Sequence, residues 1–137
     1  LALNVPVGYL TDDQCLALVA AGLVGRQVLD IRLDKVFCDR VWQRLQPWVA
    51  AGLPIERAAD GDTLEVSGLR RDRMTVPNQI DCRGDSVLAM LSVAWLTSTQ
   101  HAAYINGAGE YRQRFPGLAA IWHRLGVPLA VLSEVVS

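Results

Sequence analysis

The alternation of apolar and polar side chains predicts two strands in the first half of the chain. Over residues 29–34, every second side chain is apolar and those between are charged. Residues 63–67 show the same period of two. Successive side chains of a strand point to opposite faces, so this alternation is typical of a strand with one face against a core. We therefore expect strands at 28–33 and at 63–67.

The pattern ahead of these strands predicts a short helix near the start of the chain. Thr11 and Gln14 form a capping-box pair ahead of an apolar run that stops at Gly22. A capping box marks the first turn of a helix, and a glycine commonly follows the last turn. We expect this helix to cover residues 12–21 and to serve as a packing element.

A second helix is expected after Asp34, whose side chain suits the N-cap position. The apolar residues that follow recur at helical spacing, and the polar ones, Arg44 among them, are expected to face water. Pro47 should bend this helix or end its regular part, because proline lacks the backbone N–H that a helix interior requires.

The most apolar segment of the second half, residues 86–96, has scarcely a polar face. A helix with this pattern is buried on most sides. We expect it to begin at Asp85 or Ser86, directly after a turn at residues 81–84, and to form the centre of the core. Weaker patterns predict a strand at 102–105, an amphipathic helix at 118–125 and a last strand at 128–132.

Together these elements alternate between helix and strand, which favours an α/β fold. The predicted architecture is a small, mainly parallel or mixed sheet covered by helices. Residues 1–27 are expected to be an N-terminal helical extension, and residues 28–137 a single α/β domain. A chain of 137 residues is long enough to bury one such core.

Composition excludes several classes of protein. The net charge of −1 gives no basic surface for nucleic acid, and the longest apolar runs are about half of a membrane span. The three cysteines form no CxxC pair and have no histidine at ligand spacing, so we expect neither a metal site nor a disulfide framework. Cysteines without such partners fit a reducing compartment, so we predict a cytoplasmic protein, and the lack of a glycine-rich phosphate loop agrees with a protein without a cofactor.

Cys82 is the best candidate for a nucleophile, because a thiol just ahead of a helix can have its thiolate stabilised by free backbone N–H groups. Gln79 upstream of it resembles the arrangement in papain-type peptidases. Such chemistry needs a base, for which His101 and His123 are the candidates. A buried cysteine with a purely structural role is the more common case.

Other charged groups have simpler interpretations. Asp12-Asp13 and Asp60-Gly61-Asp62 stand where helix caps and turns favour aspartate. A third cluster consists of Arg70, Arg71 and Arg73. These arginines could bind a phosphate or an acidic surface, but such a cluster is more often only solvated. An apolar pocket for a small molecule under residues 68–79 is a further possibility, although no residue there names a ligand.

Residues 28–132 resemble a STAS domain, the fold of anti-sigma-factor antagonists and of a small subunit of bacterial lipid-asymmetry transporters. The resemblance rests on the strand and helix at 28–45, the Leu-x-Val-Ser-Gly-Leu segment at 64–69, the Ile-Asp-x-x-Gly turn at 80–84 and the helix at 118–126. Two features depart from it. The segment 70–79 is a long insertion, and Arg83 occupies the position where phosphorylated members carry serine or threonine.

The resemblance implies a non-enzymatic regulatory domain that docks a bacterial protein partner without a phosphorylation switch. The implied docking surface is the turn and helix start, Asp81, Cys82, Arg83, Gly84 and Asp85, with the three arginines at 70, 71 and 73 at its rim. Reversing the charge of Arg83 or Asp85 should then weaken partner binding without unfolding the domain. The alternative is a cysteine-dependent hydrolase or transferase with Cys82 as its nucleophile.

Overall fold

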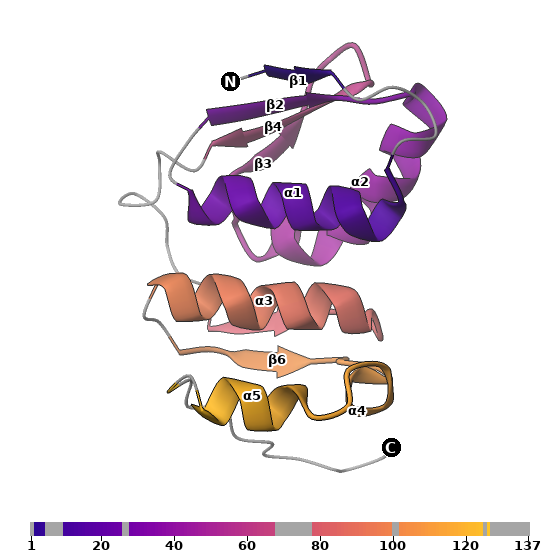
Figure 1. The fold of residues 1–137 in the computed structure, drawn as a ribbon. Helices are drawn as coiled ribbons and strands as arrows, with labels where there is room; N and C mark the ends of the chain where they lie inside the picture. Colours follow the sequence, from indigo (N-terminus) through magenta and orange to yellow (C-terminus); the bar gives the residue numbers. More distant parts are fainter. Residues whose placement is uncertain are drawn as a thin grey trace.

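The computed structural model describes residues 2–4, 10–25, 28–67, 78–99, 102–124 and 126. Helices and strands alternate along most of this length, which confirms the predicted α/β class (Figure 1). In chain order the elements are β1 (Ala2–Asn4), α1 (Asp12–Val24), β2 (Val28–Arg32), α2 (Lys35–Ala50), β3 (Ile55–Arg57), β4 (Thr63–Ser67), β5 (Gln79–Asp81), α3 (Ser86–Thr99), β6 (Tyr104–Asn106), α4 (Tyr111–Arg114) and α5 (Leu118–Arg124).

The described strands form two sheets, whereas the sequence pattern predicted one. The first sheet has the order β1-β2-β4-β3, with β1 parallel to β2 and the other neighbours antiparallel. The second is the parallel pair β5-β6. Figure 1 shows their places: the first sheet lies above α1, and α3 lies between α1 and β6, whereas α2 contacts β5 directly.

The first sheet buries one face, as its alternating sequence predicts. The apolar residues of β2 lie opposite those of β4, Leu29 against Val66 and Ile31 against Leu64. All four are buried, whereas the residues between them are half-buried or exposed. Strand β4 occupies the range predicted from the sequence, because its alternation is strict and its neighbours supply the buried face.

Helix α1 begins as expected but ends later. The capping box is complete, with Gln14 N–H donating to Thr11 Oγ1 at 3.2 Å and Thr11 N–H donating to Gln14 Oε1 at 3.0 Å. Gly22, expected to stop the helix, lies inside it. A Cβ at this position would come within 3.1 Å of Leu29 and 3.2 Å of Val66, so the glycine allows the helix to approach the sheet closely.

The described elements ahead of residue 27, β1 and α1, belong with the rest of the fold. Strand β1 pairs with β2, and the inner face of α1 is fully buried in the same core as the rest of the chain. The predicted boundary after residue 27 therefore separates elements that share one core. The buried residues of α1 are Cys15, Leu16, Val19, Ala20, Gly22 and Leu23.

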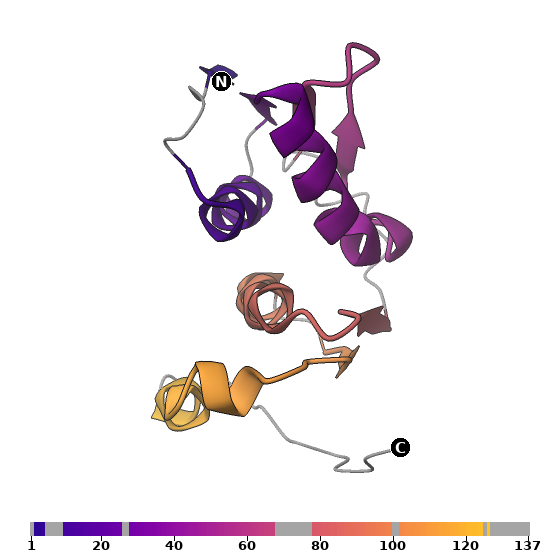
Figure 2. The ribbon, with the colours of Figure 1, turned by 90° about the vertical axis from the view of Figure 1, so that its right-hand side faces the viewer.

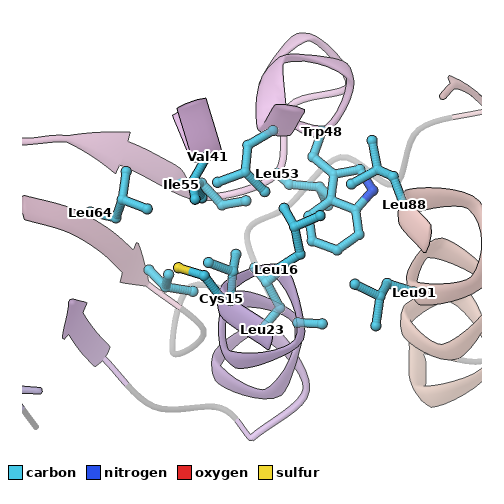
Figure 3. Packing of buried hydrophobic residues seen from close by; sticks show 14 of the residues in the cluster. Cys15, Leu16, Leu23, Val41, Trp48, Leu53, Ile55, Leu64, Leu88 and Leu91 are labelled. Carbon is cyan, nitrogen blue, oxygen red and sulfur yellow. The ribbon is translucent and has the colours of Figure 1, made fainter. Parts of the chain in front are cut away.

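Helix α2 starts at its predicted cap, with Val36 N–H donating to Asp34 Oδ1 at 2.9 Å. Pro47 lies in its last turns, and the helix continues beyond it to Ala50. Trp48 is completely buried there, and its indole N–H donates to Ser92 Oγ on α3 at 2.7 Å. Figure 3 shows its ring close to Leu16 of α1 and Leu88 of α3.

Helix α3 is the buried helix that the sequence predicted. Most of its side chains are buried, and Figure 1 shows it between α1 and β6, with the second sheet packed beside it in Figure 2. Ile80 of β5 joins the same cluster. The apolar core is therefore continuous from the first sheet through α1, α2 and α3 to β5.

Some elements were not expected, and some expectations fall outside the described residues. Strands β3 and β5 and helix α4 have only three or four residues each and show no clear sequence period. A strand was predicted at 102–105. The observed strand β6 covers Tyr104–Asn106, so it starts two residues later and ends one residue later than predicted. The strand predicted at 128–132 lies outside the residues that the structure describes.

Candidate functional site

The turn before α3 is fixed to the end of β6 by backbone hydrogen bonds. Cys82 N–H donates to the carbonyl of Asn106 at 2.8 Å, and Gly84 N–H donates to the carbonyl of Gly107 at 2.7 Å. Within the turn, Arg83 N–H donates to Asp81 Oδ1 at 3.0 Å. These bonds use the backbone donors of residues 82–84 and hold the turn in a single shape.

The backbone of this turn adopts an unusual conformation. Arg83 has a φ of 53°, and among the described residues it is alone in combining a positive φ with a side chain. Gly84 follows with a φ of 81°. A left-handed conformation costs a residue with a Cβ roughly 1–2 kcal/mol, which is why glycine is usual there. An arginine kept at such a position on the surface is a candidate functional residue.

A second glycine allows the neighbouring loop to close over the turn. A Cβ on Gly109 would lie 2.2 Å from the carbonyl oxygen of Gly84, closer than any side chain permits. The positive φ of 61° at Gly109 is itself a conformation that glycine favours. The turn and the loop after β6 therefore form one tightly packed backbone unit.

Three of the predicted docking residues are exposed at the surface: Asp81, Arg83 and Gly84. Cys82 and Asp85 are different. Cys82 is 0% exposed and Asp85 is half-buried. The structure therefore leaves three of the five predicted residues of the turn accessible to another molecule.

Cys82 lacks the surroundings of a nucleophile. Burial raises the pKa of its thiol to about 11, and the contact with Ser92 Oγ at 3.8 Å offsets only part of this effect. A reactive cysteine needs the opposite, a lowered pKa and access to solvent. Of the two candidate bases, His123 is exposed near the end of α5 and His101 lies outside the described residues.

We expect the native protein to resist alkylation at all three cysteines. Cys15, Cys38 and Cys82 are buried free thiols, and burial raises the pKa of each. Iodoacetamide at neutral pH should therefore label them slowly in buffer and quickly in urea, as read by intact mass. Rapid labelling of Cys82 alone in the native protein would instead support the cysteine-enzyme alternative.

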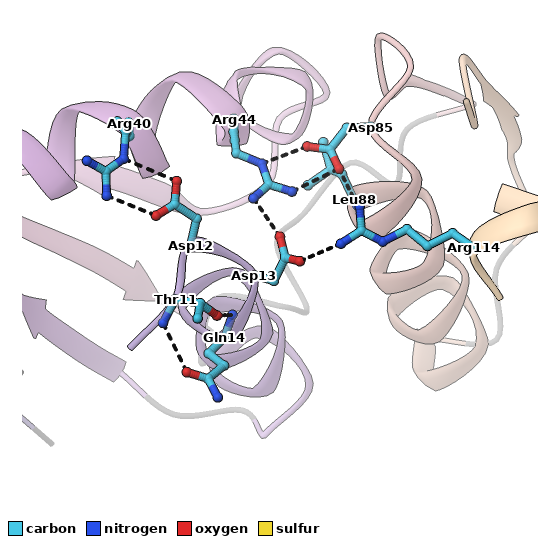
Figure 4. A network of polar contacts seen from close by, with 9 residues as sticks. All are labelled: Thr11, Asp12, Asp13, Gln14, Arg40, Arg44, Asp85, Leu88 and Arg114. Atoms are coloured by element: carbon cyan, nitrogen blue, oxygen red, sulfur yellow. Dashed lines mark hydrogen bonds and ion pairs between the residues drawn. The ribbon is translucent and has the colours of Figure 1, made fainter. Parts of the chain in front are cut away.

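Asp85 belongs to an ion-pair network that joins the two halves of the molecule (Figure 4). Arg44 of α2 donates to both carboxylate oxygens of Asp85, at 2.9 and 3.0 Å. Its remaining terminal nitrogen donates to Asp13 of α1 at 2.7 Å. Asp13 also accepts a hydrogen bond from Arg114 of α4 at 2.8 Å. Arg44 thus connects α1, α2 and the start of α3.

Asp85 has a second structural role as the N-cap of α3, because its Oδ1 accepts a hydrogen bond from Leu88 N–H at 3.1 Å. Its side chain is only 20% exposed and that of Arg44 27%. Two expectations are corrected here. Arg44 does not simply face water, and Asp85 stabilises the fold, so a charge reversal there would not leave the domain intact.

The paired aspartates at the start of α1 also have structural partners. Asp12 accepts two hydrogen bonds from Arg40 at 3.1 and 3.2 Å, and Asp13 lies in the network already described. Both carboxylates stand in the first turn, where the helix dipole favours negative charge. Asp60 likewise accepts a backbone bond from Asp62 at 3.0 Å within its turn.

The network gives the fold a predictable dependence on acid. Burial raises the pKa of Asp85, but hydrogen bonds from Arg44 and Leu88 outweigh burial and leave this pKa below its usual value. A carboxyl group with a lowered folded-state pKa stabilises the protein above the unfolded-state pKa of about 4, and this contribution is lost as the pH falls through the folded-state value.

We therefore expect urea unfolding to show a loss of stability below about pH 4, with a smaller acid-dependent loss in the Asp85→Asn variant. Asparagine preserves the cap but does not titrate. An equal dependence on pH in both proteins would show that Asp85 is not among the groups responsible.

A shallow hollow of about 250 Å³ lies beside the exposed turn. One wall comes from the C-terminal part of α2, and the other from β5 and Arg83. The sequence analysis did not identify it, because residues more than 25 positions apart along the chain form its walls. The lining residues are Pro47, Ala50, Ala51, Gln79, Asp81 and Arg83.

Other candidate sites receive no support from the described part of the chain. None of its helices combines the length and apolarity that a membrane span requires. No group of three or more His, Cys, Asp or Glu side chains in that part is placed to hold a metal ion. The three arginines at positions 70, 71 and 73, and with them the predicted rim of the docking surface, lie outside it.

Comparison of the chain with protein-family models, with curated proteins and with solved structures finds no match in any of the three. Nothing therefore identifies the chain as a STAS domain, and a proposal about its function has to rest on its own residues.

Proposed function

We propose that this chain is a non-enzymatic protein-interaction domain that docks its partner on the surface formed by Asp81, Arg83, Gly84 and the adjoining hollow. The observation that carries the proposal is the conformation of Arg83. An exposed arginine occupies a left-handed backbone position that would suit glycine better, on a turn that hydrogen bonds hold in place. Conformational strain kept at an accessible residue is a feature of binding and switch regions.

Charge supports the same surface. No ion pair of the Arg83 guanidinium occurs among the described residues, whereas Arg32, Arg40, Arg44, Arg57 and Arg114 are each paired with an aspartate. An arginine that faces a proline and two alanines across a hollow combines a charge-assisted donor with a contact for apolar groups. Arginine is also among the residues enriched at the energetic centres of interfaces.

The proposal retains part of what the STAS resemblance implied. A bacterial regulatory domain that docks through this turn, with no phosphorylated serine or threonine at position 83, remains the function we propose. The two separate sheets are not part of what that resemblance predicted, so the proposal rests on the turn itself. The free thiols at Cys15, Cys38 and Cys82 are consistent with a reducing location such as the cytoplasm.

The test compares proteins captured from an extract of the source cells by the wild type and by two variants, Arg83→Gly and Arg83→Glu. Glycine removes the guanidinium and relieves the strained φ, and its greater freedom in the unfolded chain offsets part of this gain. We therefore expect the Arg83→Gly variant to be as stable as the wild type or more stable by up to about 1 kcal/mol. Both variants should nevertheless lose the partner.

Arg124→Glu is the matched control, since Arg124 is exposed on α5 and the change in net charge is the same as for Arg83→Glu. Quantitative mass spectrometry should find a protein that the wild type and Arg124→Glu retain and both Arg83 variants lose. Identical sets of captured proteins for all four, or equal losses for Arg83→Glu and Arg124→Glu, would refute the proposal.

A further inference from the structure

Asn106 and Gly107 form the only Asn-Gly pair in the sequence, and they lie where β6 ends. Both residues are exposed. An asparagine before a glycine is prone to deamidation, because the backbone nitrogen of the next residue can attack the side-chain amide. A glycine nitrogen has no neighbouring Cβ to hinder this attack. The pair is therefore a candidate site of spontaneous modification.

The packing of the turn requires a glycine at position 107. A Cβ there would lie 2.8 Å from the backbone nitrogen of Arg83 and 2.8 Å from Asp81 Oδ1, closer than real side chains come. The φ of Gly107 is 64°, a left-handed conformation that glycine favours. A larger residue would therefore remove the Asn-Gly pair only by disturbing the turn.

The two bonds that hold the turn to the end of β6 have their acceptors on either side of the Asn106–Gly107 peptide bond. Cys82 N–H donates to the carbonyl of Asn106 at 2.8 Å, and Gly84 N–H donates to the carbonyl of Gly107 at 2.7 Å. Within the described ranges, no backbone carbonyl accepts a hydrogen bond from Gly107 N–H. The shape of the turn thus depends on the two carbonyls beside the nitrogen that would react.

We propose that Asn106 deamidates in the folded protein and that the isoaspartate formed there releases the turn. The nitrogen of Gly107 bonds to Asn106 Cγ, the Cγ–Nδ2 bond breaks, and ammonia leaves with the proton of the backbone N–H. Water then opens the cyclic imide. Cleavage of the bond to Cγ gives aspartate, and cleavage of the bond to the main-chain carbonyl carbon gives isoaspartate.

Isoaspartate changes the path of the main chain at this point. The chain then continues through Cβ and Cγ of residue 106, one carbon longer than before, and the former main-chain carbonyl becomes a carboxylate. The acceptors for Cys82 N–H and Gly84 N–H cannot both stay in place, and hydrogen bonds require distances of about 2.7–3.2 Å. The effect on docking rests on the proposed function, whereas the modification itself does not.

Asn78 is the internal control for the modification, because it is exposed directly before β5 but precedes a glutamine. The full chain is incubated in native buffer at mildly alkaline pH, and peptides are mapped by mass spectrometry. Asn106 should deamidate at least about tenfold faster than Asn78. An isoaspartyl-specific methyltransferase should label position 106. Equal rates, or deamidation of Asn106 only in guanidinium chloride, would overturn the proposal.

Hydrogen exchange tests the release of the turn. The isoaspartate form, separated by anion exchange, is compared with Asn106→Gln, whose amide closes a ring more slowly, and with fresh Asn106→Asp, which carries the charge on an unchanged main chain. The amides of Cys82 and Gly84 should exchange about tenfold faster in the isoaspartate form than in either variant. Equal exchange in all three proteins would show that the turn is not released.

The capture experiment connects this site to the proposed function and keeps the two separable. Aged wild-type protein should lose the partner that depends on Arg83, and aged Asn106→Gln should retain it. If Asn106 stays intact while capture depends on Arg83, this inference fails and the proposed function stands. If isoaspartate forms and exchange at the turn rises, but no captured protein depends on Arg83, the proposed function fails and the modification site stands.

Discussion

Replacing Trp48 with alanine is expected to lower the free energy of unfolding by about 3–5 kcal/mol, the largest effect of any single substitution that we predict. Trp48 is completely buried, and it connects α2 to α3 through both its ring and its hydrogen bond to Ser92. Alanine would leave a cavity and remove this bond. Total stabilities of domains are only about 5–15 kcal/mol, so the variant should be marginally folded at 25 °C.

Urea unfolding followed by circular dichroism provides the measurement, and two variants serve as controls. Trp48→Phe keeps most of the ring, so it should cost less than Trp48→Ala. Trp42→Ala, on the same helix but only half-buried, should also cost less. If Trp42→Ala proved as destabilising as Trp48→Ala, the position of Trp48 at the centre of the core would be wrong.

Replacing Asp85 with alanine is expected to cost about 2–4 kcal/mol, because one carboxylate caps α3 and pairs with Arg44. Loss of a cap alone costs roughly 1 kcal/mol, and removing one partner of a partly buried ion pair leaves Arg44 without its two hydrogen bonds to Asp85. Asp85→Asn keeps the capping oxygen and should therefore lose less stability than Asp85→Ala.

Asp81→Ala is the comparison, since Asp81 is an exposed aspartate of the same turn with one backbone bond to Arg83. Chemical denaturation should rank the three variants with Asp85→Ala lowest in stability and Asp81→Ala highest. Equal stabilities for Asp85→Ala and Asp81→Ala would contradict the assignment of Asp85 to the fold.

Elements with a strong local signal were predictable from the sequence. The strict alternation in β4 gave its range, the capping residues Thr11 and Asp34 gave the starts of α1 and α2, and the uniformly apolar run gave the buried helix α3. Each of these signals comes from residues close together in the chain, and a local pattern is sufficient to detect them.

Features that depend on distant residues were not predictable in this way. The sequence predicts that Gly22 ends the helix. In the structure it lies inside α1, where the lack of a side chain lets Leu29 and Val66 pack against it. Arg44 reads as a solvated residue, yet it pairs with Asp13 and Asp85, which lie 31 and 41 positions away. The short strand β5 shows no period, and the α/β alternation, although a strand was expected near β6, gave no indication that β5 and β6 form a sheet of their own.

The candidate site also combines a feature that the sequence predicted with features that it did not predict. The turn at 81–84 was identified from its sequence, because a turn signal followed by an apolar helix is local. The positive φ of Arg83, the burial of Cys82 and the hollow beside β5 depend on the folded backbone. Within the turn, the exposed Arg83 is therefore a better candidate for a functional residue than the buried Cys82.

Photo-crosslinking from the edge of the hollow tests the central claim most directly. A photoreactive phenylalanine in place of Gln79, which is exposed on β5, should form a covalent adduct with one protein in cell extract, and the same residue in place of Arg124 on α5 should not. Excess wild-type protein should compete with this adduct, and excess Arg83→Glu protein should not. Adducts from both positions, or equal competition by the two proteins, would contradict docking at this turn.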